Sequence, residues 1–318
     1  MRVLERLISS RGSLVVGGDA KSAGSGDVAK ATRVRLNRST GGDGLEQALR
    51  AALKREQGLE VFGLNTPVQV RRHPAARRLT LRVSQVRREV VLTIPPGGSL
   101  LEAGKFVGQH MDWVRQRLEQ LPVRVEVAHG ARILYRGEPH IIEMLGPTRH
   151  QRVAWSEGAR AARNALKELV EAAAPNRKAR VTLPDKLLPR LCVSGQTEHA
   201  PRRLRDWLIK QAHEDLSKRV AVHTANLGLK ASRVTVRDQT SRWGSCSSAR
   251  VLSFSWRLIL APSFVLDYVA AHEVAHLKEM NHGPRFWALV RKSMPRMEEA
   301  RRWLKKHGAE LHRYGMPE

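Results

Sequence analysis

The pentapeptide His272-Glu273-Val274-Ala275-His276 is followed by a further histidine, His282, and these residues decide how the chain is interpreted. Two histidines four residues apart on a helix lie on one face, about 6 Å apart, so their imidazoles can bind one ion. Neutral imidazole is a common zinc ligand, and catalytic zinc sites combine three protein ligands with one open position. Glu273 lies beside this face, where a carboxylate can take a proton from metal-held water. The pattern predicts one Zn²⁺ per chain, with Glu273 as the catalytic base.

The residues around this pattern favour a buried helix. Apolar residues lie on both sides of the histidines, and the predicted helix begins near Pro262 and ends near Met280. Pro284 then opens a second helix, so His282 lies at the turn between two helices. A charged side chain such as Glu273 is costly on an apolar helix unless it is paired or near a metal. This cost argues against the alternative interpretation, which is a helix with two ordinary core histidines.

The third metal ligand has two candidates. His282 follows His276 by six residues, the separation that metzincins use, although the glycine that breaks the metzincin helix is Glu279 here. The alternative is a downstream carboxylate, Glu298 or Glu299, as in glutamate-type zincins. We favour His282, in which case the two glutamates are expected to lie on a solvated helix face.

Three longer stretches resemble the YgjP-like metallopeptidase family, a relative of the SprT and WLM zincins. They are RWGSCSS (242–248), SFSWRLILAP (253–262) and HEVAHLKEMNHGPRFW (272–287), with a looser likeness at residues 71–83 and 90–96. The resemblance implies an α+β zincin-like catalytic domain, zinc held by the three histidines, and Glu273 as the catalytic base. It leaves the natural substrate open, because the family is assigned as peptidases largely through this motif.

Length and composition indicate a globular protein that does not cross a membrane. The chain of 318 residues is long enough for one large domain or two modest ones with a sizeable core. The longest apolar candidate, residues 258–271, is too short for a membrane span and is interrupted by Pro262 and Asp267. The N-terminus lacks a signal-peptide core, and Cys192 and Cys246 form no CxxC pair. A cytoplasmic location is therefore expected, and the oligomeric state is left open.

The net charge of +26 suggests an anionic partner. Such a field attracts nucleic acid and other anionic surfaces. The basic residues are scattered along the sequence rather than gathered in one stripe, which favours an arginine-rich composition spread over solvated faces. Non-specific nucleic-acid affinity at low salt is expected under either interpretation. One local group, Arg71, Arg72, Arg77 and Arg78, is a candidate for binding phosphate or an acidic substrate end, with a solvated turn as the alternative.

Composition and periodicity divide the chain into four segments. Residues 1–65 contain Gly- and Ser-rich stretches and are expected to be flexible. Residues 66–146 alternate apolar and polar positions, which predicts a β-rich α+β module with an antiparallel strand set and a helix over 99–121. Residues 147–195 are interpreted as an insertion or linker that contains a helix, and residues 196–318 as the zincin-like metallopeptidase domain.

The strands before the HEVAH helix are expected to form the rim of a substrate cleft. A long helix over residues 201–227 precedes strands at 234–237 and 252–257, with a Gly/Ser-rich turn at 238–248 between them. In zincins a strand in this position runs along the cleft, where an extended peptide can add by main-chain pairing. The stretch 242–257 is therefore the predicted substrate rim.

Three side chains of this rim are candidates for direct roles. Arg242 and Arg257 are predicted substrate-binding residues, because a guanidinium can stabilise the oxyanion that forms on a carbonyl under attack. The alternative is a structural arginine paired with Asp238 or Asp267. Cys246 is a weaker candidate, as a nucleophile or as a redox contact to the zinc, because no base is evident beside it.

These observations favour a zinc-dependent metallopeptidase that acts on a peptide or protein substrate through metal-held water and a glutamate general base. Two other functions stay open. The same site could hydrolyse nucleotides or phosphoesters, to which the surplus of arginines is suited. Alternatively, the chain is a non-enzymatic, basic nucleic-acid-binding protein with a structural metal site, which would need a fourth protein ligand that the sequence does not place well.

Overall fold

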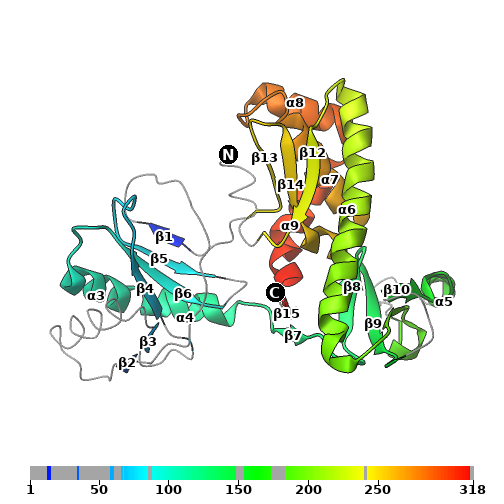
Figure 1. Ribbon diagram of the computed structural model, residues 1–318, viewed down its shortest axis with the longest axis horizontal. Coiled ribbons are helices and arrows are strands. Elements are labelled where there is room, and N and C mark those ends of the chain that lie inside the picture. The colour runs from blue at the N-terminus through cyan, green and yellow to red at the C-terminus, as the bar shows by residue number, and fades with distance from the viewer. Residues whose placement is uncertain are drawn as a thin grey trace. The chain divides into compact units, whose positions relative to one another are not determined.

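The structure is a computed structural model. It describes residues 13–15, 34–35, 58–60, 66, 68–84, 88–147, 154–172, 183–239 and 242–315. The chain forms two compact units, one spanning Ser10–Pro122 and the other built mainly from Val123–Glu318 (Figure 1). A strand-rich N-terminal region and a helical C-terminal part confirm the predicted α+β class. The predicted segment boundaries at 65, 146 and 195 stay predictions, and most of the predicted flexible segment lies outside the described residues.

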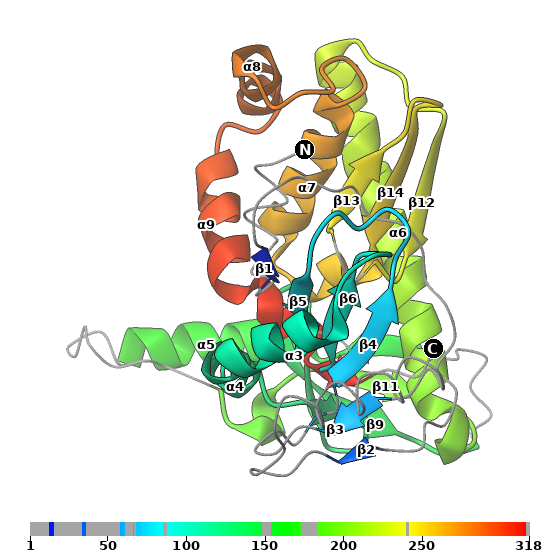
Figure 2. The same ribbon diagram turned by 90° about the vertical axis from the view of Figure 1, so that its left-hand side faces the viewer.

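Six strands of the first unit form one sheet in the order β1-β5-β6-β4-β3-β2 (Figure 2). The strands are β1 (Ser13–Val15), β2 (Val34–Arg35), β3 (Gly58–Glu60), β4 (Val68–Arg72), β5 (Thr80–Val83) and β6 (Val90–Ile94). β5 and β6 pair antiparallel, as predicted, but β4 and β6 pair parallel. The prediction of a wholly antiparallel set is wrong, because β6 inserts between β4 and β5 and so runs in the same direction as β4.

Alternating apolar side chains bury one face of this sheet beneath α3 (Leu100–Gln109) and α4 (Met111–Glu119). The core contains Val68, Val70, Leu81, Val83, Val90, Leu92, Ile94, Phe106, Val107, Met111 and Val114. The sequence predicts one helix over residues 99–121, but the structure divides it at His110. The backbone of His110 leaves the helical region (φ −110°, ψ 11°), and its Nδ1 lies 2.8 Å from the Phe106 carbonyl oxygen. The change of direction lets both helices keep apolar side chains in the core.

Arg72, one of the four arginines considered for phosphate binding, is used inside the fold. Its guanidinium donates to the carbonyl oxygens of Pro95, Pro96 and Gly98 at 2.8–2.9 Å. These hydrogen bonds fix the turn that follows β6. The phosphate-binding role of the other three arginines stays a prediction.

A four-stranded sheet lies at the start of the second unit, in the order β10-β11-β9-β8. Its strands are β8 (Arg132–Tyr135), β9 (Glu138–Met144), β10 (Ala154–Glu157) and β11 (Arg190–Val193), and α5 (Ala159–Ala172) follows β10. β8 and β9 pair antiparallel, whereas β11 pairs parallel with β9. The segment predicted as an insertion thus supplies the predicted helix and two strands of this sheet. The short strands β7 (Val125–Glu126) and β15 (Tyr314–Gly315) pair with each other.

The long helix α6 (Ala200–Leu227) runs the length of this unit, from the four-stranded sheet at one end to α8 (Pro284–Ser293) at the other (Figure 1). It ends at Gly228, whose φ of +63° is a left-handed conformation that favours glycine. Leu204, Leu208, Ala212, Leu216 and Val220 are buried at helical spacing. The predicted long amphipathic helix and its end are therefore confirmed.

Beside α6 lies a three-stranded sheet in the order β12-β14-β13. β12 (Arg233–Arg237) and β14 (Val251–Ser255) confirm the two predicted strands. β13 (Gly244–Cys246) corrects the turn predicted over residues 238–248, because it pairs antiparallel with β14 and forms one edge of the sheet. Glycine is a poor strand former, so this pairing depends on the neighbouring β14 and on α7 (Ser263–Ala275) rather than on local preference.

Three helices complete the unit: α7 (Ser263–Ala275), α8 (Pro284–Ser293) and α9 (Met297–His307). α7 carries the HEVAH pattern and begins after Pro262, as predicted. It ends before the predicted Met280, because the N–H groups of Leu277 and Lys278 bond to carbonyl oxygens three residues back and tighten the chain into a turn. Among the described residues, no helix is long and apolar enough to cross a membrane.

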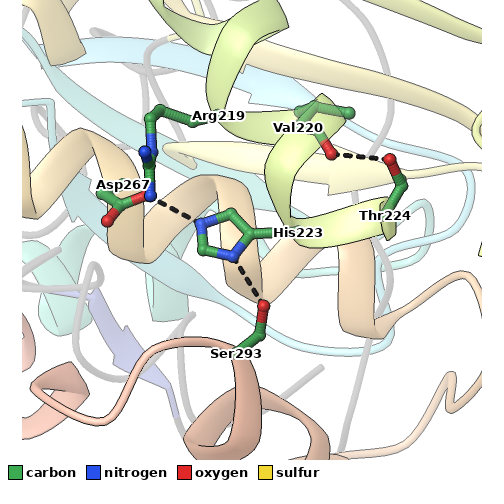
Figure 3. Close-up of polar contacts among 6 residues, drawn as sticks. All are labelled: Arg219, Val220, His223, Thr224, Asp267 and Ser293. Carbon is green, nitrogen blue, oxygen red and sulfur yellow. Dashed lines mark hydrogen bonds and ion pairs between the residues drawn. The ribbon is translucent and has the colours of Figure 1, made fainter. Parts of the chain in front are cut away.

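A buried polar network joins α6, α7 and α8 (Figure 3). His223 of α6 is fully buried, with Nε2 2.7 Å from Asp267 Oδ1 and Nδ1 2.6 Å from Ser293 Oγ. Arg219 Nε donates to the same Asp267 oxygen at 2.5 Å. Burial alone would raise the pKa of Asp267, but the hydrogen bonds from His223 and Arg219 lower it below its ordinary value of 3.8. The carboxylate is therefore ionised at neutral pH and ties α7 to its neighbours.

Asp267→Asn is expected to lower the melting temperature by about 5–10 °C at pH 7, because it removes the anionic partner from a buried network. Since the folded-state pKa is lowered, this carboxylate stabilises the fold above its ordinary pKa, and the contribution is lost as the pH falls through the folded-state value. Thermal unfolding followed from pH 7 into this acidic range should show the gap between variant and wild type closing. Asp206→Asn is the control, because Asp206 pairs with Arg205 on the surface of α6; an equal loss there would contradict the assignment.

Candidate metal centre

Three imidazoles converge where α7 meets the turn before α8. His272 lies in the last turn of α7, His276 caps its C-terminus, and His282 lies in the turn that leads to α8. One ring nitrogen from each residue lies within 4.8 Å of the other two, and the Nε2 atoms of His272 and His282 are 3.0 Å apart. No other group of three or more His, Cys, Asp or Glu side chains gathers in this way in the described part of the chain. The structure thus brings the three predicted ligands together.

One phenylalanine ring supports all three imidazoles. Phe286 of α8 is fully buried, and its centroid lies 4.5–4.7 Å from the centroids of the three histidine rings. Trp287 adds an indole N–H that donates to the His282 carbonyl oxygen at 3.1 Å. Sequence reasoning placed these two aromatic residues on the second helix but did not assign them to the site. The signal was their position, four and five residues after His282.

The donor set fits a divalent cation that prefers nitrogen ligands. Burial lowers the pKa of His272 well below its ordinary value, and lowers that of His282 to about 4, so both rings are neutral at pH 7. His276 donates from Nδ1 to the Glu279 carbonyl oxygen at 3.0 Å, which leaves a lone pair on its Nε2. The buried Nδ1 of His272 has no hydrogen-bond partner within the described ranges, and its Nε2 faces His282 Nε2 at 3.0 Å, where a shared cation would satisfy both of these Nε2 atoms. Three neutral imidazoles with converging nitrogens are the ligands that zinc-type cations bind.

Glu273 follows His272 on α7 and faces strand β13. Its side chain is only 3% exposed, and α7 packs against β13 at this point. Burial raises the pKa of the Glu273 carboxyl to about 8, and the nearby Arg242 guanidinium acts in the opposite direction. Without a metal this carboxyl group is mostly protonated at pH 7, and the positive charge of a divalent cation held by the histidines would lower its pKa towards the carboxylate that a general base needs.

The two predicted substrate-binding arginines lie in different surroundings. Arg242 is exposed and lies close enough to Glu273 to lower its pKa, so a substrate contact stays a proposal for this residue. Arg257 is buried, with Nε 3.2 Å from Asp238 Oδ1 and Nη1 donating to two carbonyl oxygens near the C-terminus. The structure therefore supports the alternative that the sequence left open, a structural Arg257 paired with Asp238.

The competing carboxylates pair with arginines, and the candidate nucleophile Cys246 carries a raised pKa. Glu298 and Glu299, the carboxylate alternatives, pair with Arg301 and Arg296 at 2.6 Å, as expected for a solvated helix face. Cys246 lies on β13, and burial raises the pKa of its thiol to about 11. A protonated thiol is a poor nucleophile and a poor metal ligand at neutral pH.

A second cluster, Asp267, His223 and Ser293, has the residue types of a serine-hydrolase triad but not its geometry (Figure 3). The hydroxyl faces Nδ1 of the imidazole and the carboxylate faces Nε2, which is the reverse of the triad arrangement. His223 and Ser293 are also buried, so no substrate reaches the hydroxyl. This cluster belongs to the helix packing.

The converging imidazoles and the buried carboxyl group on an HExxH helix are the arrangement typical of a metal-dependent hydrolase. The model of the YgjP-like metallopeptidase domain matches residues 77–307, and this chain belongs to that family. The family supports a metallopeptidase-type hydrolase that uses a metal ion. A crystal structure of the metallopeptidase zymogen abylysin from Pyrococcus abyssi is 22% identical, covers 29% of this chain and 93% of its own, and superposes with a TM-score of 0.27. A search of curated proteins found no match.

Proposed function

We propose that this chain is a zinc metallopeptidase that cleaves peptide bonds. In this proposal His272, His276 and His282 hold one Zn²⁺, and Glu273 is the general base. The observation that carries the proposal is the convergence of three neutral imidazoles beside a buried carboxylate, in a chain of a metallopeptidase family. Three protein ligands leave one coordination position for a reacting group, which is the pattern of catalytic rather than structural zinc sites.

The chain's own side chains supply the proton transfers. When bound, zinc would contribute Lewis-acid chemistry, which lowers the pKa of water and polarises a carbonyl group. The Glu273 carboxylate accepts a proton from the attacking water and then donates it to the amine nitrogen that leaves. The Glu273 side chain is buried between its own helix, α7, and strand β13, which excludes bulk water from the carboxylate. Arg242, exposed beside Glu273, is proposed to bind the substrate carbonyl oxygen as negative charge develops on it.

The open edge of β13 supports a peptide as the substrate class. Within the described residues β13 pairs only with β14. Trp243 and Ser247, on either side of β13, bond towards β14, so in an antiparallel ladder Gly244 and Cys246 direct their backbone groups to the open edge. An extended peptide can add to such an edge by main-chain hydrogen bonds, a mode of binding that a nucleotide lacks.

Metal analysis of the purified full-length chain, combined with digestion of an unbiased peptide library, tests this function. We expect about one zinc per chain, cleavage of peptides, and loss of cleavage on chelation with recovery when Zn²⁺ is added back. Chelation is also expected to lower the melting temperature, because the ion binds the folded chain in preference to the unfolded one. Parallel assays with nucleoside triphosphates separate the phosphoester alternative. Hydrolysis of these compounds without peptide cleavage, or full activity without metal, would contradict the proposal.

A further inference from the structure

Strand β13 touches the proposed general base directly. Gly244 and Cys246 lie opposite Phe254 and Leu252 of β14, which are both fully buried, and residues that lie opposite one another share a face of the sheet. This face of β13 therefore looks inward, where β13 packs against α7. Glu273 projects from α7 towards the same face. Any side chain at position 244 would have to share its space with Glu273.

Position 244 has no room for even one methyl group. An ideal Cβ built on Gly244 would lie 2.6 Å from both Cγ and Oε1 of Glu273, and 2.8 Å from Cδ. These separations are shorter than real Cβ contacts, so one of the two groups would have to move. The atoms in contact belong to the flexible end of the Glu273 side chain, so Glu273 is the group that would move. Its side chain is only 3% exposed, so any shift would have to take place inside the packed core. Gly244 does not have a positive φ, so glycine is needed here for space and not for backbone conformation.

We infer that Gly244 is a positioning residue for the general base. Its missing side chain lets the Glu273 carboxylate lie against the β13 backbone, on the same helix as His272 and beside the strand whose other edge is open to a peptide. The consequence for catalysis rests on the proposed function, whereas the contact itself does not. A displacement of about 1 Å at a reacting group can slow a reaction about 100-fold.

Gly244→Ala is expected to lower kcat by about 10- to 100-fold while KM stays within about threefold of wild type. Metal content should stay near one ion per chain, because no ligand is touched. This combination separates a displaced base from a generally damaged site, which would lose metal. Gly97→Ala is the control, because a Cβ there meets nothing within 4 Å and its φ is not positive; its kinetic constants should match those of wild type.

A double-mutant cycle on thermal stability tests the contact without any activity assay. Gly244→Ala should lower the melting temperature when Glu273 is present, and by much less in a Glu273→Ala background, where the colliding atoms are absent. If the single variant does not fold, the double variant should recover folding. Metal-free protein serves for these measurements, so the cycle is independent of zinc.

Three results would overturn the inference: equal losses of melting temperature in both backgrounds, a Gly244→Ala enzyme with wild-type kcat, or loss of metal from that variant. The loss of melting temperature could depend on Glu273 while no protein, wild type included, shows peptidase activity. That result would support the contact between Gly244 and Glu273 and would remove the proposed function. The two ideas can therefore fail separately.

Discussion

Glu273→Gln is expected to leave the metal content at about one ion per chain and to lower peptide turnover by about 10²- to 10⁴-fold, the range that a general base contributes. Glutamine keeps the shape of the side chain, so the close contact with Gly244 is preserved. It cannot accept the proton that the reaction releases. Because the three imidazoles are unchanged, metal binding should not be affected. Metal analysis and kcat, measured on one peptide that the wild type cleaves, check both halves of the expectation.

The matched control for this variant is Glu168→Gln. Glu168 is an exposed glutamate on α5, outside α7 and the turn that carry the three histidines, and it is not a candidate ligand. Its turnover should equal that of wild type. Full activity in Glu273→Gln would remove Glu273 from the role of base. Loss of metal together with activity would show instead that the carboxylate acts by supporting the ligands.

Loss of a residue that only orients a metal ligand weakens metal binding by about 10- to 100-fold. His282 is proposed to bind the metal itself, so His282→Ala is expected to weaken Zn²⁺ binding by more than about 100-fold. His272 and His276 would remain as a pair on α7, with one protein ligand fewer than a catalytic zinc site uses. Turnover should be lost in proportion to the bound metal. Competition of the purified variant against a chelator of known affinity measures the change directly.

His213→Ala is the control for the ligand substitution, because His213 is an exposed histidine on α6. It should bind Zn²⁺ as wild type does, which excludes a general effect of removing an imidazole. Wild-type affinity in His282→Ala would contradict the third-ligand assignment. In that case one of the carboxylates on α9, Glu298 or Glu299, would have to be tested by the same assay.

The candidate ligands could be predicted from the sequence because their geometry is local. His272 and His276 are one helical turn apart, and His282 follows within the next short turn, so helix periodicity and chain connectivity bring the rings together. The long helix α6 was predictable for a similar reason. Its buried residues recur at helical spacing, and Gly228 marks its end.

Features that depend on partners distant in sequence were not predictable in the same way. The parallel pairing of β4 with β6 follows from β6 inserting between two earlier strands, which no local pattern indicates. The choice of Asp238 over Asp267 as the partner of Arg257 was left open, because either acid could reach it on sequence grounds. Gly244 looked like part of a turn, since its requirement for space arises only when α7 packs against β13.

The aromatic ring that contacts all three imidazoles has a consequence for the choice of ion in the proposed metal site. Phe286 packs against all three rings, so a narrower or wider side chain at that position would move the three nitrogens in concert without replacing any of them. In the proposed metal site, the spacing of the three nitrogens, and with it the preference among cations of different size, would then depend on a residue that is itself no ligand.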